Sequence, residues 1–136
     1  GRAAAENIVP TSTGAASAIG LVIPDLKGKL DGASLRVPVV DGSCIDLTLN
    51  MSRETNADEI NHIFENNASE VIKITDDPVV SSDIIGESVG ALVDAKLTKV
   101  LDNDKKLIKV VAWYDNEYGY TAQMIRTMDK LLKLDK

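Results

Sequence analysis

Residues 107–120 read LIKVVAWYDNEYGY, and this stretch decides the fold. Its first seven residues are apolar on both alternating faces apart from Lys109, which is typical of a strand in the middle of a sheet. Further on, apolar side chains recur at intervals of three and four up to Leu132, as on one face of a helix. The sequence therefore predicts a central strand over 107–113 followed by a helix over 117–132.

Shorter patterns earlier in the chain predict the remaining elements. Alternating apolar and polar residues indicate strands, and apolar residues that follow a cap indicate helices. The predicted strands cover 35–39, 45–51, 71–74 and 91–97, and the earlier predicted helices cover 15–23 and 56–67. Loops with short extended pieces are expected over 1–13 and 78–85. The expected fold class is α+β, a mostly antiparallel or mixed sheet with about three helices.

Three local signals refine this picture. Asp41-Gly42 lies between two predicted strands and predicts a hairpin turn, because glycine adopts a positive φ without strain. Pro38 cannot donate to a strand ladder, so the strand at 35–39 is expected at an edge or at a bulge. Asn56 is placed to cap the helix that follows it.

Composition and charge exclude several classes of protein. The chain has 136 residues with 15 basic and 21 acidic side chains, a net charge of −6, and no Lys/Arg cluster, so neither nucleic acid nor an anionic membrane is an expected partner. No run of 18 apolar residues is present. Cys44 is the single cysteine, which excludes an internal disulfide and fits a reducing cytoplasm. The first residue is Gly1 rather than methionine, so we expect a start inside a larger protein, or a processed or partial product.

Two positions near the N-terminus could bind an anion. Thr13-Gly14 precedes a predicted helix, where unpaired backbone N–H groups and the positive end of the helix dipole favour negative charge. Plain helix capping explains the same residues. Arg36 carries a planar fork of donors that suits phosphate or carboxylate, and a structural ion pair is the alternative.

Aromatic residues gather at 113–120, which holds the one tryptophan and all three tyrosines of the chain. Asn116, in the middle of this cluster, has both a donor and an acceptor and could recognise a carboxamide. A strand-to-helix corner with Asn116 as the helix cap explains the cluster equally well.

Other reactive residue types do not combine into a site. Cys44 lies in a predicted strand, where a free cysteine usually acts as a small hydrophobic residue, and His62 lies on the solvated side of a predicted helix. A single cysteine and a single histidine offer no metal-ligand spacing, so no metal site is expected. No glycine-rich dinucleotide-binding fingerprint is present.

Three longer motifs carry a resemblance to a known family. The chain reads RAAA at 2–5 and NIVPTSTGAA at 7–16, LRVPVVDGS at 35–43 and WYDNEYGY at 113–120. In this order and at about this spacing, the motifs closely resemble glyceraldehyde-3-phosphate dehydrogenase, and the resemblance runs over all 136 residues. It implies that the chain is the C-terminal part of such an enzyme. Residues 1–116 would form most of the catalytic domain, with 1–13 as the end of a cofactor-facing loop. Residues 117–136 would form a helix that packs on the nucleotide-binding domain, which this chain lacks.

The resemblance also implies roles for five residues. Thr13 and the backbone of Gly14 would bind the inorganic phosphate that attacks a thioester, and Arg36 would contact the substrate phosphate or the attacking phosphate. Asn116 would hold the carboxamide of the nicotinamide of NAD, with Tyr120 beside it. The family's nucleophilic cysteine and catalytic histidine lie in upstream motifs that are missing here.

The implied activity is the NAD-dependent, phosphorylating oxidation of glyceraldehyde 3-phosphate in glycolysis, by a cytoplasmic homotetramer. The implied partners are this aldehyde, inorganic phosphate and the remainder of the enzyme. Because the nucleophile is upstream, the 136 residues alone are predicted to be inactive. Two alternatives stay open. One is an erythrose-4-phosphate dehydrogenase-like enzyme, and the other is a non-catalytic oligomerisation or interaction fragment.

Overall fold

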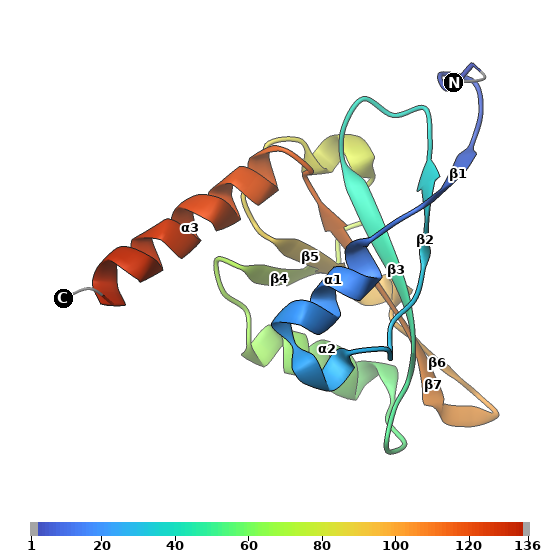
Figure 1. Ribbon diagram of the computed structural model, residues 1–136. Helices are drawn as coiled ribbons and strands as arrows, with labels where there is room; N and C mark the ends of the chain where they lie inside the picture. Colours follow the sequence, from blue (N-terminus) through green and yellow to red (C-terminus); the bar gives the residue numbers. More distant parts are fainter. Residues whose placement is uncertain (1–2, 135–136) are drawn as a thin grey trace. The chain divides into compact units, whose positions relative to one another are not determined.

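The computed structural model of the chain describes residues 3–134. Contacts divide the chain into an N-terminal unit, residues 1–40, and a C-terminal unit, residues 41–136 (Figure 1). Residues 1–2 and 135–136, the outermost parts of the predicted N-terminal loop and C-terminal helix, lie outside the described residues.

The N-terminal unit is a two-stranded ribbon with a short helix between its strands. Its elements are β1 (Val9–Ser12), α1 (Ala15–Val22), the 3₁₀ turn η1 (Pro24–Leu26) and β2 (Ala33–Arg36). β1 and β2 pair antiparallel, with Val9 opposite Arg36 and Ser12 opposite Ala33. Pro24 begins η1 directly after α1, as expected of a residue that cannot continue a helix.

The predicted hairpin at Asp41-Gly42 is wrong. β2 pairs with β1, whereas β3 (Ser43–Asn50) pairs with β7 (Asp104–Tyr114). Gly42 does have a φ of +86°. A side chain there would place its Cβ 2.2 Å from the Ser81 carbonyl oxygen, so glycine serves a close backbone approach rather than a turn between paired strands.

The C-terminal unit is built on a five-stranded mixed sheet. Its strands are β3, β4 (Ile72–Thr75), β5 (Ala91–Asp94), β6 (Lys99–Leu101) and β7, in the order β3-β7-β5-β4 with β6 also paired to β7. Only β4 and β5 run parallel to each other. β7 pairs with three strands, which confirms the predicted central strand. The expected α+β class is confirmed, with three helices among the described residues.

One face of this sheet forms a hydrophobic core with α2 (Ala57–Asn66). Ile60 of α2 packs with Val93, Ile108, Val110 and Ala112 from β5 and β7. α2 begins as predicted, because the Asn56 side chain accepts a hydrogen bond from the Glu59 backbone N–H at 2.8 Å.

Two predicted extended segments are shorter or absent. Within 78–85, residues Ser81–Ile84 form the 3₁₀ turn η2, where the Asp83 carboxylate accepts from Val80 N–H at 2.8 Å. The strand predicted over 91–97 ends at Asp94, because its carboxylate accepts from Leu97 N–H at 3.2 Å and stabilises the 3₁₀ turn η3 (Ala95–Leu97). The short strand β6 was not predicted.

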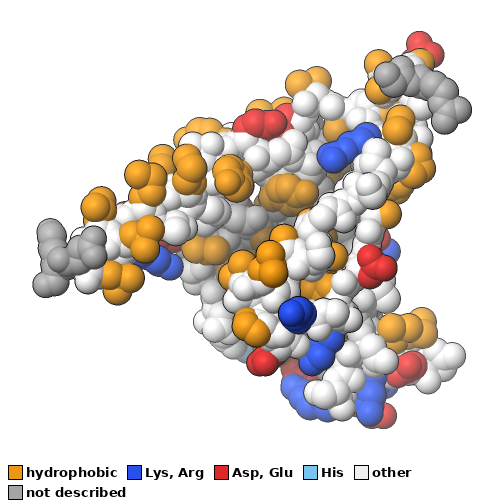
Figure 2. All heavy atoms as spheres, in the orientation of Figure 1, with side chains coloured by type: hydrophobic (Ala, Val, Ile, Leu, Met, Phe, Trp, Pro, Cys, Tyr) orange, Lys and Arg blue, Asp and Glu red, His pale blue; other side chains and the backbone are white. Residues whose placement is uncertain are grey.

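The last helix of the described residues is α3 (Tyr118–Leu134), in agreement with the helix predicted over 117–132. Gly119 at its start is buried, whereas residues 127–134 are all exposed. Figure 2 shows hydrophobic side chains along this helix. No helix within residues 3–134 combines the length and the apolar character needed to cross a membrane.

Candidate functional site

The start of α1 carries the first candidate, Thr13-Gly14. Gly14 is the N-terminal cap residue of α1. A Cβ at this position would meet no atom within 4 Å, so the space beside it is open. The Thr13 hydroxyl oxygen accepts from Ala15 N–H at 3.2 Å, so its own O–H remains a donor. Capping and anion binding are therefore compatible, because the Thr13 oxygen accepts from the helix while its O–H group can still donate to an anion.

Arg36, the last residue of β2, is exposed. Within residues 3–40 its guanidinium forms neither an ion pair nor a hydrogen bond. The alternative of a structural ion pair thus has no partner inside the N-terminal unit. An exposed, uncommitted guanidinium keeps all its donors for a phosphate or carboxylate ligand.

The ribbon register separates these two candidates within the N-terminal unit. Arg36 lies opposite Val9, four positions before Thr13 on β1. At the rise of an antiparallel strand, this spacing is about 13 Å along the ribbon. The two candidates therefore offer donors at different points of one small unit.

The corner between β7 and α3 carries Asn116. The structure corrects the alternative that Asn116 caps the helix, because the neighbouring Asp115 does so. The Asp115 carboxylate accepts from Glu117 N–H at 2.9 Å and Tyr118 N–H at 2.6 Å, and also from Gly86 N–H at 2.8 Å. These three donors, that of Gly86 first, lower the pKa of Asp115, which is only 2% exposed.

Sequence reasoning overlooked Asp115. Asp115 could have been found from its place just before the predicted helix. A carboxylate in this position often accepts hydrogen bonds from the first backbone N–H groups of a helix. With Asp115 as the cap, the Asn116 side chain is free for another contact. Its Oδ1 accepts a hydrogen bond from the Ser43 hydroxyl.

Carboxylates also gather at this corner. One oxygen from each of Asp41, Asp115 and Glu117 lies within 4.8 Å of the others. A hydrogen bond with Asp41, burial and repulsion from both neighbours raise the pKa of Glu117. Both Asp115 oxygens already accept backbone N–H groups, so this cluster is not a free set of metal ligands. It lines a shallow hollow of about 370 Å³ together with Ile85, Gly86, Tyr118 and Thr121.

Tyr120 lies in the first turn of α3 and is 69% exposed. Its ring is therefore available to a planar ligand rather than used for packing. The neighbouring Gly119 allows α3 to approach a loop, since a Cβ there would lie 3.0 Å from the Val89 carbonyl oxygen.

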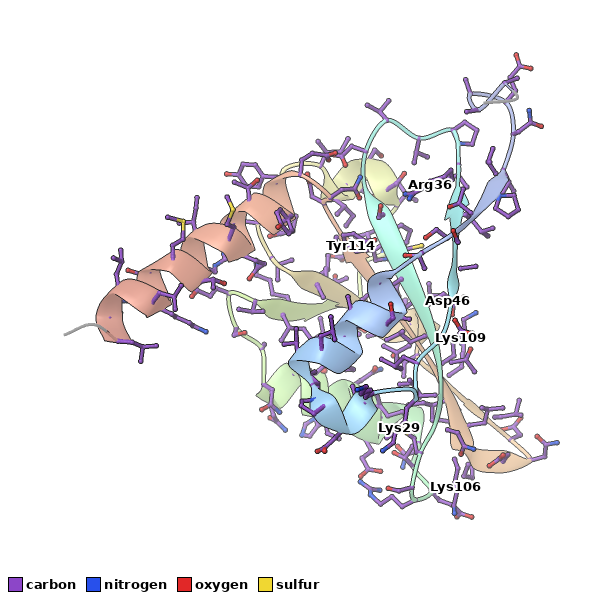
Figure 3. The ribbon with its side chains drawn as sticks, viewed as in Figure 1. Lys29, Arg36, Asp46, Lys106, Lys109 and Tyr114 are labelled. Carbon is purple, nitrogen blue, oxygen red and sulfur yellow. The ribbon has the colours of Figure 1, made fainter. Side chains whose placement is uncertain are left out.

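Cys44 and His62 do not form a pair. Cys44 lies opposite Trp113, so it faces away from the sheet surface that α2, with His62, covers through Ala112. Burial and the charge of Asp46 raise the pKa of the Cys44 thiol, which disfavours the reactive thiolate. Figure 3 shows Asp46 on this face beside Lys109, and their charged groups pair at 2.7 Å. The exposed His62 contacts Glu65 at 3.0 Å.

The predicted residues thus fall into two groups by unit. Thr13, Gly14 and Arg36 lie in the N-terminal unit, and Asn116 and Tyr120 lie at one corner of the C-terminal unit. The first group offers hydrogen-bond donors at exposed positions, and the second offers an amide side chain and an exposed aromatic ring.

Comparisons with known proteins agree with the motifs. Residues 1–116 match the family described as glyceraldehyde 3-phosphate dehydrogenase, C-terminal domain. The chain is 53% identical to the glyceraldehyde-3-phosphate dehydrogenase of Streptococcus pyogenes, over 99% of this chain and 40% of that protein. It is 52% identical to the protein of the same name from Streptococcus dysgalactiae subsp. equisimilis, with the same coverage. The chain therefore spans less than half the length of these relatives. With 116 of its 136 residues matched, it belongs to the glyceraldehyde-3-phosphate dehydrogenase C-terminal domain family.

Proposed function

We propose that this chain is the part of a phosphorylating glyceraldehyde-3-phosphate dehydrogenase that holds phosphate groups and orients the nicotinamide. The observation that carries this proposal is the exposed guanidinium of Arg36, which has no hydrogen bond or ion pair within residues 3–40 and lies in the same small unit as the start of α1. Family membership supports this proposal, and the proposed reaction oxidises an aldehyde phosphate and then adds inorganic phosphate.

Two separated anion positions fit a reaction with two phosphate groups. The backbone N–H of Gly14 and the O–H of Thr13 would hold one dianion at the positive end of α1, where the Ala15 N–H is already bonded to the Thr13 oxygen. Arg36, about 13 Å away along the ribbon, would contact the other with paired donors. Holding both groups converts a collision between reactants into a reaction within one complex.

The corner at Asn116 fits the nicotinamide end of NAD. The amide nitrogen of Asn116 offers donors to a carboxamide, and the exposed Tyr120 ring offers a flat apolar surface. NAD, when bound, would supply hydride acceptance. This chain's own contribution is to hold the carboxamide and so fix the orientation of the ring.

Within residues 3–134, the cysteine of this chain is not an activated nucleophile. The raised pKa of Cys44 and its separation from His62 across the sheet argue against a thiolate–imidazole pair. We therefore place the nucleophilic cysteine and the histidine in the upstream remainder of the enzyme, and expect the 136 residues alone to be inactive. The exposed apolar side chains of α3, such as Met128 and Leu131, would pack on the nucleotide-binding domain.

The wider assembly follows from the same proposal. The intact protein would be a cytoplasmic homotetramer, and this chain would work only with the remainder of the enzyme. An interaction fragment without catalysis is favoured by one observation, the exposed apolar side chains of Met128, Leu131, Leu132 and Leu134 on α3. Turnover by the isolated chain that disappears in Cys44→Ala would overturn the placement of the nucleophile upstream.

The test uses the intact enzyme with Arg36→Gln. Because a charged hydrogen bond to a phosphate is lost, kcat/KM for glyceraldehyde 3-phosphate is expected to fall about 100-fold. Arg53→Gln is the matched control, since Arg53 pairs with Glu59 and has no assigned ligand. Equal kcat/KM for Arg36→Gln and the unsubstituted enzyme would sink the assignment. Comparing glyceraldehyde 3-phosphate with erythrose 4-phosphate in the same assay decides which aldehyde is preferred.

A further inference from the structure

One hydrogen bond joins the candidate nicotinamide corner to the neighbouring strand. Ser43, the first residue of β3, lies opposite Tyr114, the last residue of β7. The Ser43 hydroxyl donates to Oδ1 of Asn116, 73 residues further along the chain. This hydrogen bond holds the Asn116 side chain against the first residue of β3.

The hydrogen bond decides which end of the amide is free. An asparagine side chain has one acceptor oxygen and one NH₂ group, and it can present either after a half-turn about its last bond. Because Oδ1 already accepts from the Ser43 hydroxyl, the Nδ2 donors of Asn116 are the groups left for a ligand. The Asn116 side chain is therefore available to donate a hydrogen bond to a ligand rather than to accept one from it.

We propose that Ser43 is a positioning residue that fixes Asn116 as a donor to the carbonyl oxygen of the nicotinamide carboxamide. This inference rests on the proposed role of Asn116. It adds the direction of the hydrogen bond and names the residue that sets it.

The backbone of the corner is held independently of Ser43. The buried Asp115 carboxylate accepts from the backbone N–H groups of Gly86, Glu117 and Tyr118 at 2.6 to 2.9 Å. The Asn116 side chain is held separately, by the hydrogen bond that its Oδ1 accepts from the Ser43 hydroxyl. Loss of the hydroxyl should release the amide without unfolding the corner.

A double-mutant cycle on NAD binding tests the inference in the intact protein, with Kd measured by calorimetry. Asn116→Ala is expected to raise Kd about tenfold and Ser43→Ala about fivefold, the range of one neutral hydrogen bond. In the Asn116→Ala background, Ser43→Ala is expected to add nothing, because no amide remains to be positioned. Thr48→Ala, which removes an exposed hydroxyl from the same strand, is the matched control and should leave Kd unchanged.

A second ligand tests the direction of the hydrogen bond. In a dinucleotide with an acetyl group in place of the carboxamide, the carbonyl oxygen remains and the NH₂ group is lost. Because Asn116 donates to that oxygen, Ser43→Ala should weaken this ligand by the same factor of about five. An effect of Ser43→Ala on NAD that vanishes with the acetyl ligand would show that Asn116 presents Oδ1 instead, and would overturn the proposal.

The other outcomes separate this inference from the function on which it rests. If Asn116→Ala leaves the Kd for NAD unchanged, the nicotinamide role of the corner fails. If Asn116→Ala weakens NAD but Ser43→Ala does not, or if the two losses add, the positioning role of Ser43 fails alone. Should Ser43→Ala not fold, Ser43→Thr and Ser43→Val make the same comparison with equal shape. Only the hydroxyl-bearing variant should then bind like the unsubstituted protein.

Discussion

The two units of the chain differ in how much they bury. Among the described residues of the N-terminal unit, Gly20 alone is buried. The C-terminal unit buries a set of side chains that includes Ile84, Val89, Val93, Ile108 and Val110. The first unit has a ribbon and a short helix with little apolar packing, and the second has a core of its own.

This difference extends to the polar groups that are free to bind a ligand. In the N-terminal unit Arg36 has no partner within residues 3–40, and Gly14 has no side-chain cap. In the C-terminal unit Asp115 is used by three backbone donors, and Asn116 is held by Ser43. The donors of Arg36 thus have no partner within residues 3–40, whereas the polar side chains of Asp115 and Asn116 are hydrogen-bonded within their own unit.

The largest expected loss of stability comes from a substitution at Gly42 in the C-terminal unit. In Gly42→Ala the Cβ would lie 2.2 Å from the Ser81 carbonyl oxygen at a φ of +86°, so β3 or η2 must move. We expect a loss of about 4 kcal/mol, about 1 from the backbone conformation and about 3 from the overlap. Urea unfolding followed by the fluorescence of Trp113, the one tryptophan, measures it.

Gly86→Ala is the matched control for this substitution. Its φ of +85° is nearly the same, but a Cβ at Gly86 meets no atom within 4 Å. It should cost only about 1 kcal/mol. Equal losses at Gly42 and Gly86 would mean that the close approach to Ser81 contributes nothing.

The next effect compares apolar truncations in the two units. Ile108 is 4% exposed within the core, and Ile108→Ala is expected to cost about 3 kcal/mol through lost burial and a cavity. Leu21 on α1 is 81% exposed, so Leu21→Ala should change the free energy of unfolding by less than about 0.5 kcal/mol. Urea unfolding of both variants provides the measurement. A larger loss at Leu21 than at Ile108 would reverse the comparison.

The sequence predicted the well-packed elements best. The central strand at 107–113 and the helix capped by Asn56 were predicted correctly, because periodic apolar residues and caps act locally. The hairpin at Asp41-Gly42 was wrong, because the same glycine signal serves a contact with Ser81, 39 residues away. A contact at that separation has no local pattern.

The candidate site was only partly predictable for the same reason. Thr13 and Asn116 could be singled out by residue type and motif, but their partners could not. Ser43 contacts Asn116 through the pairing of β3 with β7, and Gly86 reaches Asp115 across 29 residues. These partners are brought together by the pairing of strands that are distant in sequence, and local sequence patterns do not show which strands pair.

Smaller losses of stability are expected from substitutions at the starts of α2 and α1. Asn56→Ala removes the acceptor for Glu59 N–H and should destabilise the C-terminal unit by about 1 kcal/mol. Thr13→Val removes only the longer bond from Ala15 N–H at 3.2 Å and should cost less than about 0.5 kcal/mol. Thermal unfolding of both variants measures these changes. If Thr13→Val costs as much as Asn56→Ala, the Thr13 hydroxyl is a structural cap rather than a group left for a ligand.

The smallest effect is a pH dependence confined to the C-terminal unit. The pKa of Glu59 is about 2, lowered first by the hydrogen bond from Arg53 and then by that from Thr55. Since this is below the ordinary value of about 4.3, the charged group stabilises the fold above that pH, and the contribution is lost as pH falls toward about 2.

Glu59→Gln tests this dependence directly. Its free energy of unfolding should be lower than that of the unsubstituted chain at pH 6, and the two should converge between about pH 4.3 and 2. Urea unfolding at several pH values measures the convergence. Arg53→Gln should raise the pKa of Glu59 and move the convergence to higher pH, because it removes the main cause of the shift. A difference that stays constant down to pH 2 would show that the exposed pair is screened by solvent and adds no pH-dependent stability.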